Sequence, residues 1–455
     1  MANTTKKQIR YFYWFVTEFF KKNLKLLVVS FFISFIFIVG FISLSPYLQT
    51  IFFSKKQVIG IVGKYDVNNL TEEITSKISN GLVYLNEKGE VSPTLASSWE
   101  ILDNGLKYKV TLKNNLIWSD GQKFKASDIN YSFKDVTIDT TRGDNIIYFN
   151  LKKPLPIFLG YLRKPIIRYP LKGVAGLYKV NLMRTKYGKI EFLSLTPNKK
   201  GLSVIEYKFF DNENLMVNAY KMGQITEMTV TKKSIADVFN TWKNTVVEKN
   251  VDYTKLLTLF FNINNKLLKE KDFRKSIITG LDQSNFKDEG EMALGPIPPV
   301  STVYNRNLRA DLYDIETATK AIKKNLGSNK EIINLYTYYD YINYADSITE
   351  NLKKLGFKVN INFITYEKPD NFDMLLAFWK VPLDVDQYYF WHSTQKEGNI
   401  SNYVNVRVDK LLEDGRNSTN PAEQKKVFFD FQKTILDDPP AAFLIYPYVY
   451  TIKRK

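Results

Sequence analysis

Residues 332–363 read IINLYTYYDYINYADSITENLKKLGFKVNINF, and their pattern indicates the fold class. Its first segment, Ile332 to Tyr336, has the length and apolar content of a short strand. Gly356 ends a helix in which apolar residues recur at helical spacing, at Ala345, Ile348, Leu352 and Leu355. Phe357 to Phe363 alternates apolar and polar residues and predicts the next strand. A strand, a helix and a strand in this order form a right-handed parallel unit, so we predict an α/β lobe.

Candidate binding residues follow from where the strands of this lobe end. Met374 to Trp379 (MLLAFW) is a continuous apolar run, as expected for a parallel strand that is covered on both faces. Ligands of such sheets bind beyond the carboxyl ends of the strands. Tyr338 and Tyr339 follow the first strand, and Trp379 and Lys380 end the later one. We therefore expect these four residues to line a ligand site, with packing as the alternative for the tyrosines.

The region before this lobe also shows strands and turns. Leu106 to Leu112 alternates apolar and polar residues, which predicts a half-buried strand. Asp120 and Gly121 predict the turn that follows. We interpret the loop from Trp118 to Gly121 as a turn with packing contacts, although its residue types resemble those of a catalytic loop. Ile129 to Val136 is interpreted as a short helix.

An apolar segment near the N-terminus predicts a membrane anchor. Leu26 to Leu44 contains nineteen residues without a charge, and at ~1.5 Å per residue it nearly spans the hydrocarbon core of a bilayer. Basic residues are concentrated before it, at Lys6, Lys7, Arg10, Lys21, Lys22 and Lys25. We predict a cytoplasmic tail at 1–25, one transmembrane helix at 26–45 and a spacer at 46–56, with the bulk of the chain outside the cell membrane. A cleaved signal peptide is the alternative, but Pro46 follows the only small-residue pair that resembles a cleavage site.

Composition excludes several classes of function. The net charge of +17 is scattered over the chain, without the basic stripe and stacking aromatics of a nucleic-acid-binding surface. Cysteine is absent and His392 is the only histidine, so a transition-metal site and a His-dependent hydrolase are not expected. Asp384 and Asp386 are a carboxylate pair that could serve glycoside hydrolysis, but on a strand or turn they point apart as easily as together. We therefore predict a protein that is not an enzyme and needs no cofactor.

A resemblance covers nearly everything after the spacer. Its strongest part is an ordered series of residue types: Gly81-Leu82-Val83-Tyr84, Pro93 to Glu100, Asn104 to Tyr108, Trp118-Ser119-Asp120-Gly121 and Asp128 to Phe133. This series resembles the signature of the family 5 extracellular solute-binding proteins, the oligopeptide- and dipeptide-binding receptors. Weaker matches follow, among them Phe261 to Asn264, Phe273 to Ile277 and Phe443 to Tyr446.

The resemblance implies a two-lobed clamp of the periplasmic-binding-protein type (type II). It places the first lobe at 57–245, with a small inserted domain at about 81–160. The second lobe is expected at 246–432, and 433–455 returns to the first. Ligand is then held between the lobes, and the closed receptor, a monomer, docks on the permease subunits of an ABC transporter. Only Asp135 to Asn145 remains of a longer helical stretch, so the small domain is trimmed, and Lys125 replaces a helix-capping hydroxyl residue.

The ligand class is left open between two alternatives. Peptide-binding members commonly place an aspartate shortly after the strand-ending tryptophan, where it holds the free amino group of the peptide. Here Lys380 and Pro382 follow Trp379, and the first carboxylates are Asp384 and Asp386. Capture of a peptide ammonium must then use one of these two, since an unpaired buried charge is costly. An anionic or sugar-like solute paired with Lys380 is the second alternative, and a tethered sensor or scaffold of the same fold is a third function.

Overall fold

The computed structural model describes most of the chain, in two compact units. One unit comprises residues 1–57 with 201–204, and the other comprises residues 58–200 with 205–455. The described residues are 2–52, 56–86, 90–141, 145–309, 313–326, 331–365, 369, 372–382, 385–418 and 420–455.

The first unit contains helix α1 (Ala2–Phe52), which leaves helical geometry at Asn23. The predicted span at 26–45 lies inside this helix. No single helix of the described residues is long and apolar enough to cross a bilayer. Two consecutive segments, Arg10–Leu26 and Val28–Gly40, meet the length and composition criteria together but are bent by 62°. The described residues therefore do not show the single straight span that was predicted at 26–45.

The second unit begins with the sheet of the first lobe. Neighbouring strands in it follow the order β10, β11, β12, β1, β13 and β20 (Ala441–Arg454). Helices pack on this sheet in two separate hydrophobic cores. Helix α2 contributes Ile74 and Ile78 to one core, and α4 and α5 contribute Tyr220 and Phe239 to the other. The elements are β1 (Lys56–Val62), α2 (Glu72–Ile78), β10 (Tyr178–Lys186), β11 (Lys189–Pro197), β12 (Val204–Phe210), α4 (Glu213–Lys221), β13 (Glu227–Val230), α5 (Lys233–Asn240) and β14 (Thr245–Val251).

A small domain lies in the chain between β1 and β10 and consists of β2 to β9 with α3. Its main sheet is antiparallel, in the order β4, β5, β7 and β6. The predicted strand is present as β5, whose residues alternate between buried and half-buried positions. The elements are β2 (Val83–Leu85), β3 (Val91–Pro93), β4 (Ala96–Leu102), β5 (Lys107–Leu112), β6 (Val136–Thr140), β7 (Ile146–Leu151), α3 (Phe158–Tyr161), β8 (Ile167–Arg168) and β9 (Lys172–Gly173), with 3-10 turns at Asp103–Gly105 and Ala126–Asp128.

One local prediction in this domain is wrong. Ile129 to Val136 forms no helix; the only helical turn there is the short one at Ala126–Asp128. The Asp128 carboxylate caps the start of that turn, where it accepts a hydrogen bond from the backbone N–H of Lys125 at 2.9 Å. The same carboxylate accepts from the indole nitrogen of Trp118 at 3.1 Å. The carboxylate therefore satisfies a backbone donor at the turn where Lys125 offers no hydroxyl.

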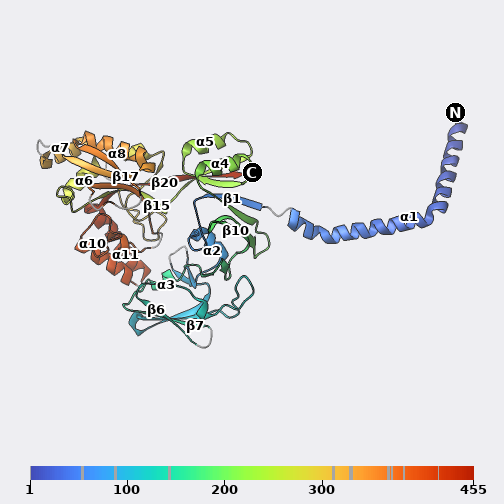
Figure 1. Ribbon diagram of the computed structural model, residues 1–455, viewed down its shortest axis with the longest axis horizontal. Helices are drawn as coiled ribbons and strands as arrows, with labels where there is room; N and C mark the ends of the chain where they lie inside the picture. The colour runs from blue at the N-terminus through green and yellow to red at the C-terminus, as the bar shows by residue number, and fades with distance from the viewer. Residues whose placement is uncertain are drawn as a thin grey trace. The chain divides into compact units, whose positions relative to one another are not determined.

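The second lobe confirms the predicted α/β unit. Strands β17 and β18 are parallel, and β17 is also parallel to β19, whereas β15 runs antiparallel to β19. Figure 1 shows α7 and α8 on one side of these strands and α10 and α11 on the other. The elements are β15 (Lys255–Phe261), α6 (Lys271–Thr279), β16 (Gly290–Met292), α7 (Ile315–Leu326), β17 (Ile332–Tyr338), α8 (Ile342–Lys354), β18 (Lys358–Ile364), β19 (Met374–Lys380), α9 (Tyr388–Trp391), α10 (Val406–Asn417) and α11 (Pro421–Asp437), with 3-10 turns at Gln283–Phe286 and Tyr339–Tyr341.

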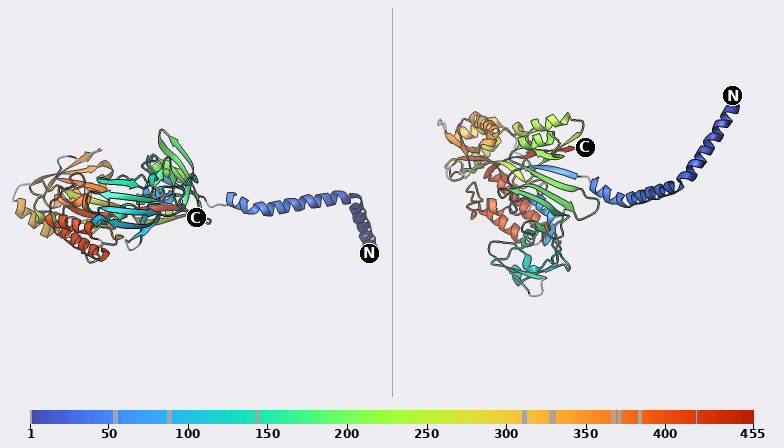
Figure 2. Two further views of the ribbon diagram at one scale, coloured as in Figure 1. Left: turned by 90° about the horizontal axis from the view of Figure 1, so that it is seen from below. Right: turned by 45° about the vertical axis from the view of Figure 1, so that its right-hand side comes forward.

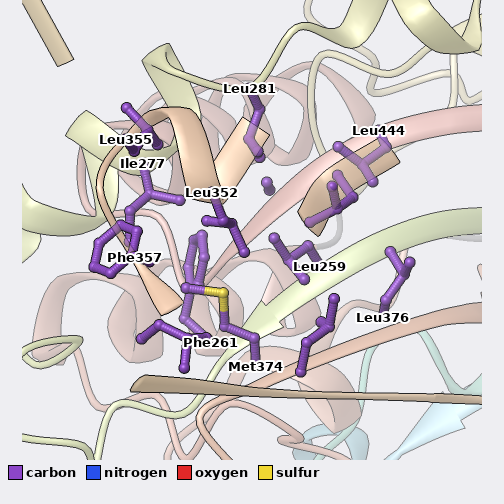
Figure 3. Packing of buried hydrophobic residues seen from close by; sticks show 14 of the residues in the cluster. Leu259, Phe261, Ile277, Leu281, Leu352, Leu355, Phe357, Met374, Leu376 and Leu444 are labelled. Atoms are coloured by element: carbon purple, nitrogen blue, oxygen red, sulfur yellow. The ribbon is translucent and has the colours of Figure 1, made fainter. Parts of the chain in front are cut away.

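Strand alternation divides the second lobe into two cores. Leu259 and Phe261 of β15 face the helices α6, α7 and α8 and pack in one cluster with Ile277, Leu352 and, from β19, Met374 (Figure 3). The intervening residues of the same strand, including Phe260, face α9, α10 and α11. Because successive side chains of a strand point to opposite faces, a central strand needs apolar residues at nearly every position.

The last strand, β20 (Ala441–Arg454), connects the lobes. Its first residues pair with β15 and β16, and Tyr448 to Arg454 pair with β14. One continuous strand therefore contributes to the sheets of both lobes. The predicted domain boundaries stay predictions. The strand pairing shows that the chain returns to the first lobe within β20.

Candidate functional site

Two cavities are lined by residues of the small domain together with residues of the second lobe. The first, which we name the Lys380 cavity, has a volume of about 850 Å³. From the second lobe, Lys380 at the end of β19 lines this cavity. The opposite walls come from the loop and helix at 67–75, from 130–133 and from 160–170. A residue of the second lobe thus completes a cavity that is otherwise built by the first.

The second cavity, which we name the Asp386 cavity, has a volume of about 940 Å³. The small domain contributes apolar residues such as Ile101, Pro156 and Leu159. The second lobe contributes Val300 to Val303, Val385 and Asp386, and the first residues of α11. Figures 1 and 2 show α10 and α11 extending from the second lobe toward the small domain. Both volumes fall within the ~300–1,000 Å³ that ligand pockets usually have.

The two cavities differ in charge. Among its described lining residues, the Lys380 cavity has the cationic side chains of Arg163, Lys164 and Lys380 and the carboxylate of Glu72. Among the described residues, no carboxylate lies within ion-pair distance of the Lys380 ammonium. The Asp386 cavity is balanced, with Glu90 and Asp386 against Arg163 and Lys425. An anionic group is therefore better accommodated in the Lys380 cavity.

A hydrogen-bonded cluster joins the small domain to the second lobe between these cavities. The hydroxyl of Tyr161 in α3 donates to the Asp386 carboxylate. Arg416 of α10 places its Nη2 3.2 Å from that carboxylate, and the backbone N–H of Tyr388 donates to it at 3.1 Å. The Asp386 side chain is only 14% exposed. Burial, followed by the Asp386 charge, raises the pKa of the Tyr161 hydroxyl above its usual value, so Tyr161 stays protonated and remains a donor.

Comparison with known protein families identifies the family of this two-lobed chain. The model of the bacterial extracellular solute-binding proteins, family 5, matches residues 90–169 and 195–401. The chain belongs to this family. As a family 5 protein it is a solute-binding protein rather than an enzyme, and the family is extracellular, in agreement with the predicted location of the bulk of the chain.

Individual relatives extend the match over most of the solute-binding protein. The oligopeptide-binding protein AppA of Bacillus subtilis is 24% identical, over 86% of this chain and 86% of its own. The structure of AppA in complex with a nonapeptide has a TM-score of 0.67 at 21% identity and covers 88% of this chain and 94% of its own. NikZ of Campylobacter jejuni in complex with Ni(L-His) has a TM-score of 0.72 at 21% identity, with the same coverage. These two structures are similar in fold while their ligands differ, so fold alone does not identify the ligand.

The predicted site residues of the solute-binding protein fall into two groups. Lys380 and Asp386 each line one of the cavities described above. Asp384 lies outside the described residues. Tyr338 packs at half-buried depth against the second-lobe core, and Tyr339 is 74% exposed with its ring against Phe363. Ligand contact by the two tyrosines stays a prediction, and neither lines the two cavities.

Trp379 lies in the core of the second lobe instead of facing the cavities. Its side chain is 8% exposed, and its indole N–H donates to the hydroxyl of Thr258 at 3.0 Å. The ring contacts Phe390 at a centroid distance of 4.6 Å and Trp391 at 5.7 Å. These contacts are those of a packed aromatic residue whose polar group is satisfied. Its predicted contact with ligand therefore has no support from its position.

The loop and the histidine that resembled catalytic groups have structural partners. Trp118 is buried, and Asp120 accepts from Arg168 at 2.8 Å and from Lys172 at 2.6 Å. The Lys172 ammonium holds the pKa of the Asp120 carboxyl below its usual value. His392 is buried, and its Nδ1 accepts from the backbone N–H of Thr394 at 3.2 Å. Within the described part of the chain, no three His, Cys, Asp or Glu residues are grouped to hold a metal ion.

Sequence reasoning missed Tyr161 and Arg163, which line both cavities, and Arg416, which lies beside Asp386. Tyr161 and Asp386 are 225 positions apart in the chain, and α3 is a four-residue helix without a periodic pattern. The resemblance did include Asn130 to Phe133, which line the Lys380 cavity, but it assigned them no ligand contact. Arg163 and Lys164 lie far from Lys380 in the sequence, so their place in the same cavity could be found only from the fold.

Proposed function

We propose that this protein captures peptides between its lobes outside the cell and delivers them to an ABC transporter. The observation that carries the proposal is the Lys380 cavity, which is lined from both lobes in a chain of the solute-binding family. The name of the relative AppA, an oligopeptide-binding protein, supports peptides as the ligand. A cleft between two lobes can close around an extended chain and hold its main chain by strand-like hydrogen bonds, which tolerates varied side chains.

The charges favour a particular end of the peptide at the Lys380 cavity. We propose that the terminal carboxylate lies near Lys380, since Lys164 and Arg163 line the same cavity. Asp386 is a poor anchor for a peptide ammonium, because its carboxylate already accepts from Tyr161 and lies beside Arg416. Asp384 remains the other proposed anchor for the amino end.

Lys380→Gln is expected to weaken the binding of a random peptide pool roughly two- to fivefold, the range for an exposed ion pair. The physical reason is the loss of a cation opposite the ligand carboxylate. Calorimetry measures the change, and a pool with amidated C-termini should bind parent and variant equally. Lys433→Gln, an exposed lysine on α11, is the matched control.

Three other results would redirect the proposal. If acetylation of the peptides or Asp384→Asn abolishes binding, the amino end is the anchored one. If amidation leaves the effect of Lys380→Gln intact, the carboxylate does not lie near Lys380. If no peptide binds and mass spectrometry of co-purified material finds an acid or a sugar, the peptide assignment fails in favour of the anionic or sugar-like solute.

We also propose that residues 26–45 anchor the protein in the cell membrane, with the N-terminus in the cytoplasm. The support is the uncharged run from Leu26 to Leu44, preceded by basic residues. The full chain should remain in the membrane fraction through a high-salt wash, whereas a chain that starts at residue 57 should appear in the soluble fraction. Release of the full chain by salt, or a mature N-terminus near residue 46, would contradict the anchor.

A further inference from the structure

The two cavities of the cleft share one wall. Gly160, Tyr161 and Arg163 line both the Lys380 cavity and the Asp386 cavity. Of these, Tyr161 reaches across to the second lobe, where its hydroxyl donates to Asp386. A ligand that extends from one cavity into the other therefore runs along this shared wall, beside the Tyr161 side chain.

The Asp386 carboxylate is contacted by groups from both the small domain and the second lobe. It is surrounded by the Tyr161 hydroxyl, the Arg416 guanidinium and the backbone N–H of Tyr388. The Tyr388 ring covers the guanidinium, with 4.3 Å from the Arg416 Cζ to the ring centroid. The Arg416 side chain is 26% exposed. Charge-assisted hydrogen bonds that are shielded from water are strong, so this cluster does not need a ligand to hold it together.

We infer that Tyr161 is a gate, which ties the small domain to the second lobe through Asp386 and Arg416 and divides the cleft into two chambers. With the gate closed, a ligand is confined to the Lys380 cavity. With the gate open, the cleft extends into the Asp386 cavity, whose lining includes Ile101, Leu159 and Val303. The second chamber therefore accepts an uncharged, apolar part of a longer ligand, such as the hydrophobic residues of an extended peptide. This last step rests on the proposed function; the tie between the lobes does not.

The tie is tested first, without any ligand. The chain contains no cysteine, so Lys113→Cys in the small domain and Lys433→Cys in α11 provide two unique positions for spin labels. In the full chain in mild detergent, Tyr161→Phe keeps the ring and removes the donor. A lost hydrogen bond to a carboxylate should shift the ratio of closed to open molecules roughly 10- to 100-fold toward the open form, which widens the label distance distribution.

Two further variants make the result specific. Tyr187→Phe removes the hydroxyl of a tyrosine that is 94% exposed on the turn between β10 and β11, and it should leave the distances unchanged. Asp386→Asn combined with Tyr161→Phe should open the lobes no further than the more open of the two single variants, because both act on one interaction. An unchanged label distance distribution for Tyr161→Phe overturns the tie, whether or not the protein binds peptides.

The gate is tested by ligand length. Calorimetry with peptide pools of two to three residues and of eight to ten residues compares parent, Tyr161→Phe and Tyr187→Phe. We expect the ratio of the affinity for the long pool to that for the short pool to be roughly tenfold higher in Tyr161→Phe than in the parent. A widened distance distribution with an unchanged length preference overturns the division into chambers. If no form binds any peptide, the proposed function fails, while the distances still decide the tie.

Discussion

Trp379→Ala is expected to lower the free energy of unfolding by about 3–5 kcal/mol, the usual cost of removing a large aromatic side chain from a packed core. The indole is 8% exposed and is surrounded by aromatic rings of Phe260, Phe390 and Trp391. Truncation also leaves the hydroxyl of Thr258 without the indole N–H that donates to it. Chemical denaturation of the chain measures the loss.

The affinity for ligand provides the second half of this test. Because the Trp379 side chain lines neither cavity, Trp379→Ala should leave the peptide dissociation constant within about twofold of the parent, once the measurement is made on the folded fraction. Tyr339→Ala is the control, since this tyrosine is 74% exposed and its removal should change stability by less than about 0.5 kcal/mol. A loss of affinity without a loss of stability would place the indole in contact with ligand.

Trp379 also shows how far the sequence determines the second lobe. The apolar run that ends at this residue predicted strand β19, and the helical spacing before it predicted α8; both are present. The strand end was therefore located correctly. The direction of the side chain was not, because it depends on α9, whose Phe390 and Trp391 cover the indole. The local sequence pattern of β19 does not indicate which later segment packs on the strand.

The cleft was predictable only where it coincides with a strand end. Lys380 is the last residue of β19 and lines a cavity, while its contact with a ligand stays a prediction. Tyr161 meets Asp386 only because the small domain and α10 approach each other in the folded chain. Such a contact between segments 225 positions apart has no periodic signal, so it had to come from the fold.

Arg274→Met is expected to lower the free energy of unfolding by about 3–5 kcal/mol, as when one partner of a buried ion pair is removed. The guanidinium side chain is 2% exposed and forms an ion pair with Asp438. It also donates to three backbone carbonyls: Leu268 at 2.6 Å, Lys269 at 2.8 Å and Pro439 at 2.7 Å. Methionine fills similar space but donates nothing, so these acceptors and a carboxylate lose their partner.

The position of these acceptors makes the effect relevant to the whole clamp. Asp438 and Pro439 lie between α11 and β20, the strand that pairs with both lobes. Arg274 thus fixes the segment from which the connection between the lobes begins. Lys275→Met is the matched control: its ammonium lies 3.3 Å from Asp437 and its side chain is 36% exposed, so its loss should cost less than about 1 kcal/mol. Equal effects of the two substitutions in urea denaturation would mean that the buried network around Arg274 contributes no more than a surface ion pair.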